Sequence, residues 1–315
     1  MKLKKPKFWD EKKPNFLSYF LLPLTIPIVI NNLLLKRKKN QSNQQIKTIC
    51  VGNIYVGGTA KTPLTIKIYE IIKNLKYKAA TIKKFYKDQI DEQKILRSKT
   101  VLYCEENRNH ALDQAIKDDI DIVIFDDGLQ DRSVNYDLKF VCFNNIKGVG
   151  NGFLIPAGPL REKIESISKY DAVFLNGNEK NNSDFKSLIN KYDKDIPIFE
   201  STYKPTNIDQ FNTNTKYVIF SGIGNPESFK ETLINNRLEI VKEIIFPDHY
   251  QYTTKDIINI RLHAKRLNAQ ILTTEKDFTK IDSQQNKDIK ILKIELTIKD
   301  EQKLINYLKL YIWNL

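Results

Sequence analysis

The residues best suited to chemistry in this chain lie between Val51 and Pro63, where the sequence reads VGNIYVGGTAKTP. A glycine-rich turn and the pair Lys61 and Thr62 directly follow a short run of β-branched residues. Glycines between a strand and a helix let backbone N–H groups approach an anion at the positive end of the helix dipole. Lys61 would reach the β- and γ-phosphates of a nucleotide, and the Thr62 hydroxyl would bind Mg²⁺. The segment therefore predicts a phosphate-binding loop.

The turn departs from the usual spacing of such a loop. The pattern G-x-x-x-x-G-K-[ST] requires glycine at two positions where this chain has Tyr55 and Ala60. We expect the turn residues Gly57, Gly58, Thr59 and Ala60 to surround the phosphates. A glycine-rich turn that caps an ordinary helix is the alternative.

A second motif, DIVIFDDGLQ, is an apolar run that ends in two carboxylates and a glycine. Carboxylates at the end of such a strand are where phosphate-loop enzymes hold their metal ion. Asp126 or Asp127 would bind Mg²⁺ directly or through water, and the ion would neutralise the triphosphate. Asp-Asp-Gly is also a common turn, and the preceding phosphate loop is what favours the functional interpretation.

Three further segments combine turn residues with polar side chains. The Gly/Pro-rich loop at residues 150–162 ends in Arg161 and Glu162, and the arginine offers a forked donor for phosphate. FPDHYQY holds His249, one of three histidines, at the end of an expected strand, where it is a candidate for proton transfer. IDEQKIL carries Asp91, which by itself is a residue typical of a helix start.

The chain of 315 residues is long enough for two domains, and its net charge of +13 predicts attraction to polyanions. No zinc-finger spacing, aromatic RNA-binding signature or arginine stripe supports nucleic acid as a partner. Cys50, Cys104 and Cys142 are widely separated within apolar runs, so we expect buried, reduced thiols. The sequence gives no indication of the oligomeric state.

Residues 16–35 form a strongly apolar segment that is flanked by lysine-rich stretches on both sides. Pro23 and Pro27 interrupt it, and its continuous apolar stretch is short of the ~20 residues of a comfortable membrane span. Positive charge on both sides favours an interfacial helix on anionic lipid, with a single span or a buried core helix as alternatives. We therefore expect residues 1–40 to form a membrane-associated segment.

From residue 46 the chain alternates short β-rich runs with helical stretches, which is typical of α/β folds with parallel sheets. The expected strands are 47–51, 79–83, 100–104, 121–127, 138–143, 172–176, 197–201, 217–224, 238–247, 269–277 and 289–296. A polar, turn-rich break at residues 204–214 separates two series of elements. The prediction is an α/β protein with two doubly wound α/β/α domains, a P-loop NTPase-like domain over 41–205 and a second domain over 206–315.

Seven segments in this order resemble the tetraacyldisaccharide 4'-kinase family, the lipid A 4'-kinases of Gram-negative bacteria. They are VGNIYVGGTAKTP, IDEQKIL, DDGLQ, NGFLIPAGPLRE, SGIGNPESF, FPDHYQY and TTEKD, and with the apolar N-terminus they cover residues 16–277. Each segment alone is weak, but their collinear order is specific.

The resemblance implies ATP- and Mg²⁺-dependent phosphorylation of the 4'-hydroxyl of a tetraacylated glucosamine disaccharide 1-phosphate. It also implies an enzyme at the cytoplasmic face of the inner membrane, on an anionic membrane surface. By match to the family's motifs, phosphate and metal would be held by Lys61, Thr62, Asp126 and Asp127, and the site would be lined by Gln130, Arg161 and Glu162. Asp91 would pair with His249, whose imidazole would take the proton of the sugar hydroxyl.

The chain departs from the family's pattern at three places. Ala60 stands where the family has glycine, the segment KKFYK at residues 83–87 replaces a stretch rich in serine, arginine and glycine, and Asp131 replaces a histidine. If position 60 requires a positive φ, a Cβ there costs ~1–2 kcal/mol. A membrane-bound NTPase of the switch type and a non-catalytic binding paralogue are the alternatives to an active kinase.

Overall fold

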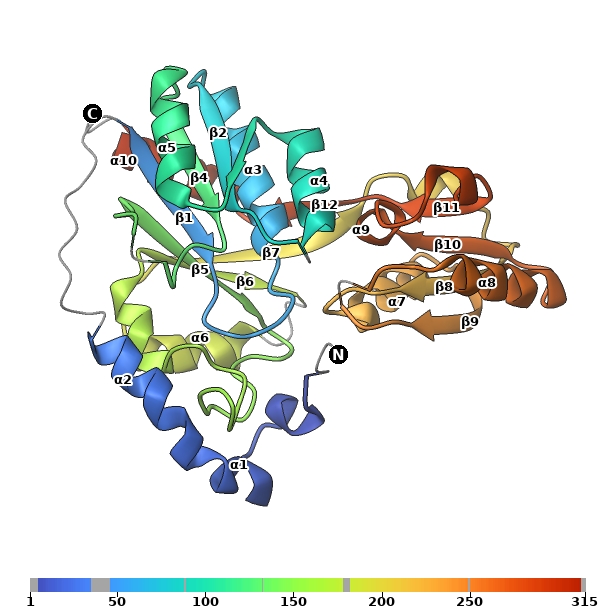
Figure 1. Cartoon of the computed structure of the whole chain (residues 1–315), viewed down its shortest axis with the longest axis horizontal. Helices are drawn as coiled ribbons and strands as arrows, with labels where there is room; N and C mark the ends of the chain where they lie inside the picture. The colour runs from blue at the N-terminus through green and yellow to red at the C-terminus, as the bar shows by residue number, and fades with distance from the viewer. Residues whose placement is uncertain are drawn as a thin grey trace. The chain divides into compact units, whose positions relative to one another are not determined.

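The computed structural model describes residues 5–34, 46–87, 89–131, 133–177, 182–248 and 250–312 (Figure 1). The chain forms two compact units, and each of them is assembled from separate stretches of the sequence. The first unit comprises the chain up to Phe85, then Lys99–Thr202, and the stretch from Leu296 onward. The second comprises Tyr86–Ser98 and Tyr203–Glu295.

An eight-stranded sheet forms the centre of the first unit, in the order β12-β7-β6-β5-β1-β4-β2-β3. Its strands are β1 (Lys47–Gly52), β2 (Ala79–Lys84), β3 (Leu102–Glu105), β4 (Ile122–Asp126), β5 (Leu138–Asn144), β6 (Ala172–Asn176), β7 (Ile198–Pro205) and β12 (Ile294–Ile298). The pairings from β3 across to β7 are parallel. Strand β12 is antiparallel to β7, as shown by the backbone hydrogen bonds from Lys299 N to Glu200 O and from Thr206 N to Lys293 O. The sheet is therefore mixed.

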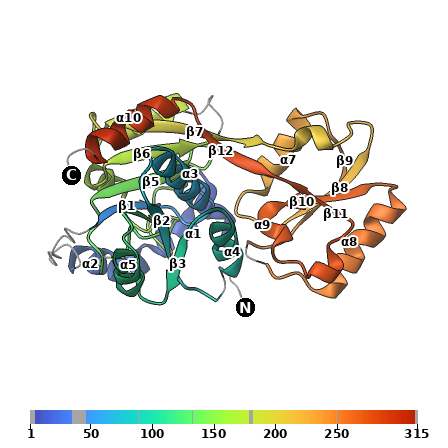
Figure 2. The same cartoon turned by 90° about the horizontal axis from the view of Figure 1, so that it is seen from above.

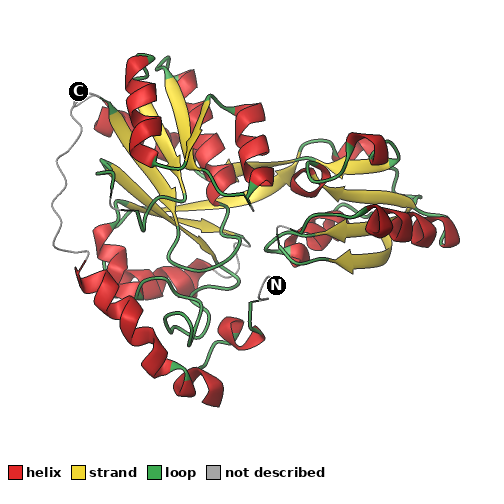
Figure 3. Ribbon diagram, in the orientation of Figure 1, coloured by secondary structure: helices red, strands yellow, loops and turns green. Residues whose placement is uncertain are grey.

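Helices cover both faces of this sheet, which explains why its central strands are apolar along their whole length. On one face, α5 (Arg108–Lys117) packs Ala111, Leu112 and Ala115 against β1, β2 and β4. On the same face, α6 (Asn182–Asn190) buries Phe185 and Ile189 against β5 and β6. The other face carries α3 (Lys61–Asn74) and α10 (Glu301–Ile312), which are joined by an ion pair between Lys67 and Glu301 (Figures 2 and 3).

The second unit is built on a four-stranded parallel sheet in the order β11-β10-β8-β9. Its strands are β8 (Lys216–Ser221), β9 (Glu239–Ile245), β10 (Gln270–Thr274) and β11 (Ile289–Leu292). Its helices are α4 (Ile90–Lys99), α7 (Pro226–Asn235), α8 (Thr254–Arg266) and α9 (Glu275–Phe278). Two apolar clusters, one with α7 and one with α8, give this unit its own core. The α/β class predicted from the sequence is confirmed.

Two details of the predicted organisation differ from the structure. The single strand expected at residues 289–296 is wrong: it is two strands, β11 and β12, which belong to different sheets and are separated at Lys293. The predicted division at residue 205 also differs from the compact units. The segment 86–98 belongs with the second unit and the stretch from Leu296 with the first, because strand pairing and ion pairs act across long sequence distances.

The thiols follow the prediction except at one position. Cys50 and Cys142 are buried and free, and burial raises the pKa of both thiols. Cys104 is instead partly exposed, because it lies on β3 at the edge of the sheet.

The N-terminal segment is a series of short helices rather than one continuous helix. These are η1 (Lys7–Asp10), α1 (Phe16–Phe20), η2 (Leu22–Thr25) and α2 (Ile26–Leu34). Pro23 lies at the start of η2, in keeping with its inability to continue a helix. Within the described residues, no helix combines the length and the apolar character needed to cross a bilayer.

Candidate active site

The predicted phosphate loop connects buried strand β1 to helix α3, which begins at Lys61 as expected. Gly57 has a φ of 138°, a backbone conformation that glycine adopts readily and other residues rarely do. Ala60 has a φ of 68° and lies in the left-handed region, so the condition under which its Cβ costs free energy is met. Ala60 is also the N-cap of α3 and offers no side-chain hydrogen bond to the first turn.

Asn53 holds this loop from within and was missed by the sequence analysis. Its amide Nδ2 donates to the carbonyl oxygen of Gly57 at 3.3 Å and to the Thr59 hydroxyl at 2.9 Å. The side chain is fully buried, and its Oδ1 has no hydrogen-bond partner among the described residues. The signal was present, because an asparagine directly after a buried strand is a polar group that needs partners.

Thr62 and Asp126 meet at the centre of the site. The Thr62 hydroxyl donates to Asp126 Oδ2 at 2.9 Å, and the Thr65 hydroxyl lies 3.4 Å from Oδ1. The ammonium of Lys83 donates to the same Oδ2 at 2.7 Å, and both Lys83 and Asp126 are buried. Strand β4 brings Asp126 here because its register pairs it with Val51, the residue before the end of β1.

Asp127 starts a chain of polar contacts on the other side of the loop. Arg161 donates from one guanidinium nitrogen to Asp127 Oδ1 at 3.0 Å and to Gln130 Oε1 at 2.9 Å. Gln130 donates in turn to Glu162 at 3.0 Å, and the Lys61 ammonium lies 3.8 Å from Asp127 Oδ2. Burial alone would raise the pKa of Asp127, but the nearby charges, chiefly Lys61 and then Arg161, hold that pKa below its ordinary value.

Arg108 is a second residue that the sequence analysis missed. It donates to the backbone oxygen of Asp127 at 2.8 Å and forms an ion pair with Asp131 at 2.6 Å. Asp131, which replaces the histidine of the family's pattern, therefore pairs with Arg108 in this chain. Position 128 also requires glycine for a structural reason, because a Cβ there would lie 2.6 Å from the Tyr136 hydroxyl.

The oxygen donors of this site fit Mg²⁺. No group of three His, Cys, Asp or Glu side chains that could hold a metal ion occurs in the part of the chain that the structure describes. A phosphate-dependent Mg²⁺ site does not need such a group of three side chains. In these sites the ion is held by one or two carboxylates together with substrate phosphates and water. Thr62, Asp126 and Asp127 supply the hard oxygen ligands that such a site uses.

A cavity of about 350 Å³ lies beside these residues in the first unit. Its polar lining includes Gln130, Arg161 and Glu162, and its remaining lining includes Ile28 and Asn32 of helix α2. Asn32 also donates to the backbone oxygen of Arg161 at 3.2 Å. The N-terminal segment therefore contacts the loop that carries the predicted phosphate ligands.

The second unit holds a separate cluster of buried charges around Asp91. Lys280 lies 3.5 Å from Asp91 Oδ2 and 2.9 Å from Asp277, and all three side chains are fully buried. Lys276 lies 3.6 Å from the same Asp91 oxygen, 3.3 Å from Glu92 and 3.3 Å from Asp248. Burial opposes the charge on Lys276, but these carboxylates outweigh it and raise its pKa. Lys276 of the segment TTEKD and Lys280, three residues after it, therefore hold Asp91.

The predicted base itself, His249, lies outside the described residues. Its neighbour Asp248 shares the Lys276 ammonium with Asp91, so the two predicted partners come from segments that contact the same lysine. The structure therefore brings together most of the predicted site in the first unit, and it places Asp91 in the second.

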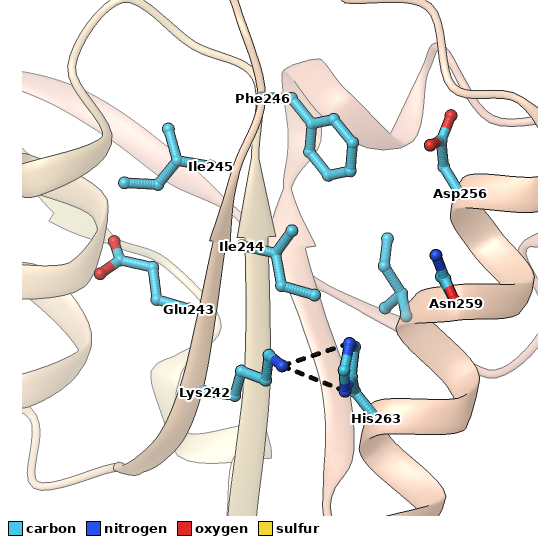
Figure 4. Close-up of a pocket in the computed structure, with 9 residues that line it drawn as sticks. Lys242, Glu243, Ile244, Ile245, Phe246, Asp256, Asn259 and His263 are labelled. Carbon is cyan, nitrogen blue, oxygen red and sulfur yellow. Dashed lines mark hydrogen bonds between the residues drawn. The ribbon is translucent and has the colours of Figure 1, made fainter.

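A larger cavity of about 470 Å³ in the second unit contains none of the predicted site residues. It lies between strand β9 and helix α8, and the Lys242 ammonium there lies 3.1 Å from Nδ1 of His263 (Figure 4). Its walls include apolar side chains such as Ile244 and Phe246. His263 therefore contacts Lys242 in a cavity that none of the predicted site residues lines.

Known proteins and a solved structure resemble this chain along nearly its whole length. The sequence profile of the family described as tetraacyldisaccharide-1-P 4'-kinase matches residues 18–100 and 91–312. The chain is 49% identical over 308 residues to the tetraacyldisaccharide 4'-kinase of Pelagibacter ubique (strain HTCC1062), with 98% of each chain covered. It is 34% identical to the protein of the same name from Rickettsia bellii (strain OSU 85-389), covering 89% of this chain and 90% of the relative.

Among solved structures, the chain resembles one described as the "apo" form of LpxK from Aquifex aeolicus in complex with ATP. The TM-score is 0.70 at 21% identity, and the match covers 94% of this chain and 100% of that one. At 21% identity, this similarity shows that the two chains share a fold.

Proposed function

Because the chain belongs to the tetraacyldisaccharide-1-P 4'-kinase family, we propose that it transfers the γ-phosphate of ATP to the 4'-hydroxyl of a tetraacylated glucosamine disaccharide 1-phosphate. The observation that carries the assignment is the hydrogen bond from the Thr62 hydroxyl to Asp126, with the Lys61 ammonium beside Asp127. It joins the end of the phosphate loop to the end of the strand that bears the carboxylates.

Phosphoryl transfer depends mostly on positioning and on neutralising charge. Lys61 and Arg161 supply positive charge for the phosphates, and Asp127 holds both of them in place through its two oxygens. Thr62, Asp126 and Asp127 would hold Mg²⁺, which when bound neutralises the β- and γ-phosphates. Gln130 fixes the orientation of Arg161, since it accepts from the guanidinium and donates to Glu162.

We assign removal of the sugar proton to His249, with Asp91 as the carboxylate that orients the imidazole. A sugar hydroxyl is a weak nucleophile, and a positioned base contributes ~10²–10⁴-fold to the rate. The shared contact of Asp91 and Asp248 with Lys276 supports this assignment, because it ties helix α4 to the segment that precedes His249. Phosphate binding then falls to the first unit and proton removal to the second.

The acceptor is a lipid, so the enzyme must work at a membrane surface. The large apolar side chains that α1, η2 and α2 expose support an interfacial role for the N-terminal segment: Phe16, Leu17, Tyr19, Phe20, Leu24, Ile26 and Ile30. Lys12 and Lys13 are exposed next to them, as expected of a segment that contacts anionic lipid. We propose that the protein works at the cytoplasmic face of the inner membrane and binds it through this segment.

The direct test is transfer of radiolabelled γ-phosphate from ATP to the disaccharide lipid by the purified full-length protein in detergent with Mg²⁺. We expect transfer by the wild type and transfer at least ~10²-fold slower by Lys61→Ala. Hydrolysis of ATP without transfer to the lipid would instead favour the switch-type NTPase.

The base is tested in the same assay with Asp91→Asn and His249→Ala. Each variant should lower turnover by ~10²-fold or more and leave the Kd for ATP close to that of the wild type. His263→Ala is the matched control, since His263 contacts Lys242 beside the other cavity. Transfer that survives unchanged in both variants would remove Asp91 and His249 from the mechanism.

A further inference from the structure

Lys83 is a buried lysine in the candidate active site to which the mechanism above gives no role. It lies near the end of β2, and the register between β2 and β4 sets it directly beside Asp126. Its side chain is 2% exposed and that of Asp126 is fully buried. Burying an ammonium is costly unless it is paired, and here the partner is a carboxylate 2.7 Å away.

Lys83 contacts the carboxylate that is proposed to hold the metal. Asp126 Oδ2 accepts hydrogen bonds from the Lys83 ammonium and from the Thr62 hydroxyl. Thr62 and Asp126 are the residues that would hold Mg²⁺ in the proposed reaction. The ammonium therefore lies against the carboxylate that would hold a divalent cation, and its charge also lowers the pKa of Asp127.

The balance of charge at this place disfavours a cation. Three positive side chains, those of Lys61, Lys83 and Arg161, contact the two carboxylates Asp126 and Asp127. A divalent ion that approaches this group without nucleotide meets a positive surplus and must displace an ion pair. A bound triphosphate adds several negative charges, which attract the metal and offer the Lys83 ammonium another partner.

We propose that Lys83 is a built-in counter-cation that competes with the divalent metal for Asp126, so that metal binds tightly only together with nucleotide. The inference rests on nucleotide binding at the phosphate loop, which the proposed function requires. It gives Lys83 a specific effect on the order of binding: metal enters as the metal–nucleotide complex rather than first.

The test is Mn²⁺ binding to the full-length protein in detergent, measured by electron paramagnetic resonance without nucleotide. Lys83→Met should bind Mn²⁺ about tenfold or more tightly than the wild type, because one positive charge close to the ion is removed. Lys83→Arg keeps the charge and should bind as weakly as the wild type. Lys84→Met, at the next position of the same strand, should also match the wild type.

Thermal unfolding gives a second measurement that needs no turnover. In Lys83→Met the Asp126 carboxylate stays buried without its ammonium, so the variant should be less stable than the wild type. Added Mn²⁺ should restore its melting temperature without nucleotide, while the wild type should respond only when a non-hydrolysable ATP analogue is present.

Two results would overturn the proposal. One is equal Mn²⁺ affinity of the wild type and Lys83→Met in the absence of nucleotide. The other, which needs no variant and so decides the matter even if Lys83→Met does not fold, is Mn²⁺ binding to the wild type that is equally tight with and without the analogue. Neither measurement uses the lipid. A failure of lipid phosphorylation would therefore contradict the proposed function without deciding whether Lys83 competes with the metal.

Discussion

The Thr62 hydroxyl donates a hydrogen bond of 2.9 Å to Oδ2 of Asp126. The two residues are distant in the sequence, and they meet because β1 and β4 pair in parallel with Val51 beside Asp126. The carboxyl ends of neighbouring parallel strands lie at the same edge of a sheet, which is where α/β proteins bind their ligands. This contact defines the part of the first unit where nucleotide and metal are expected to bind.

Replacing Lys61 by methionine should lower kcat for lipid phosphorylation by ~10²–10³-fold, the usual cost of losing one charge-stabilising group. The reason is that Lys61 is the cation of the phosphate loop and lies 3.8 Å from Asp127. Steady-state kinetics with the disaccharide lipid would measure the effect. Lys73→Met, an exposed position on the same helix, should retain wild-type activity. Equal losses in both variants would mean that the site does not depend on Lys61.

Replacing Ala60 by glycine should stabilise the protein by ~1 kcal/mol, because it removes a Cβ from a residue with a φ of 68°. Urea unfolding would measure the stability, and calorimetry would measure the Kd for ATP, which we expect to fall. Lys76→Gly is the matched control, since Lys76 has a φ of 71° just after the other end of α3. That variant should gain stability without any change in ATP affinity.

Replacing Lys280 by methionine should destabilise the protein by ~3–5 kcal/mol, the range seen when one partner of a buried ion pair is removed. Lys280 is fully buried between Asp91 and Asp277, so its loss leaves two buried carboxylates without their shared cation. Chemical unfolding would measure the change, with the exposed Lys287→Met as control. Adding Asp277→Asn to Lys280→Met should recover part of the loss. No recovery in the double variant would show that the ion pair is not the cause.

Acid should weaken the fold in part through Asp127. Its pKa is lowered in the folded state, so its contribution to stability is complete above its unfolded pKa of about 4 and is lost as pH falls through the lower folded value. The unfolding free energy of the wild type should therefore fall more steeply below about pH 4 than that of Asp127→Asn. Urea unfolding over a pH series would show this, with Asp113→Asn, an exposed carboxylate, expected to behave as the wild type.

Replacing Phe16 and Phe20 together by glutamate should reduce binding to anionic vesicles by about tenfold or more, since both rings are exposed and would enter the lipid. Vesicle sedimentation would measure the partition. Leu310→Glu is a suitable control, because Leu310 is 70% exposed on α10 of the same unit. A similar loss in the control, or no loss in the double variant, would contradict the proposed membrane role of the N-terminal segment.

Local patterns in the sequence predicted the glycine-rich loop, the helix that begins near Lys61 and a strand over residues 121–127, which the structure shows as Ile122–Asp126. They could do so because apolar runs, glycines and helix starts depend on neighbouring residues only. The departure from the family's glycine pointed to position 60, where the structure shows Ala60 with a left-handed backbone.

Only the tertiary structure decided which distant residues meet. Strand register sets Lys83 beside Asp126. Chain packing brings Arg108 to Asp127, and it brings Lys276 and Lys280 to Asp91. The same long-range pairing divides residues 289–296 between two sheets. A lysine or arginine in a single sequence looks the same whether it is solvated or buried, because its role depends on the carboxylate that another segment supplies.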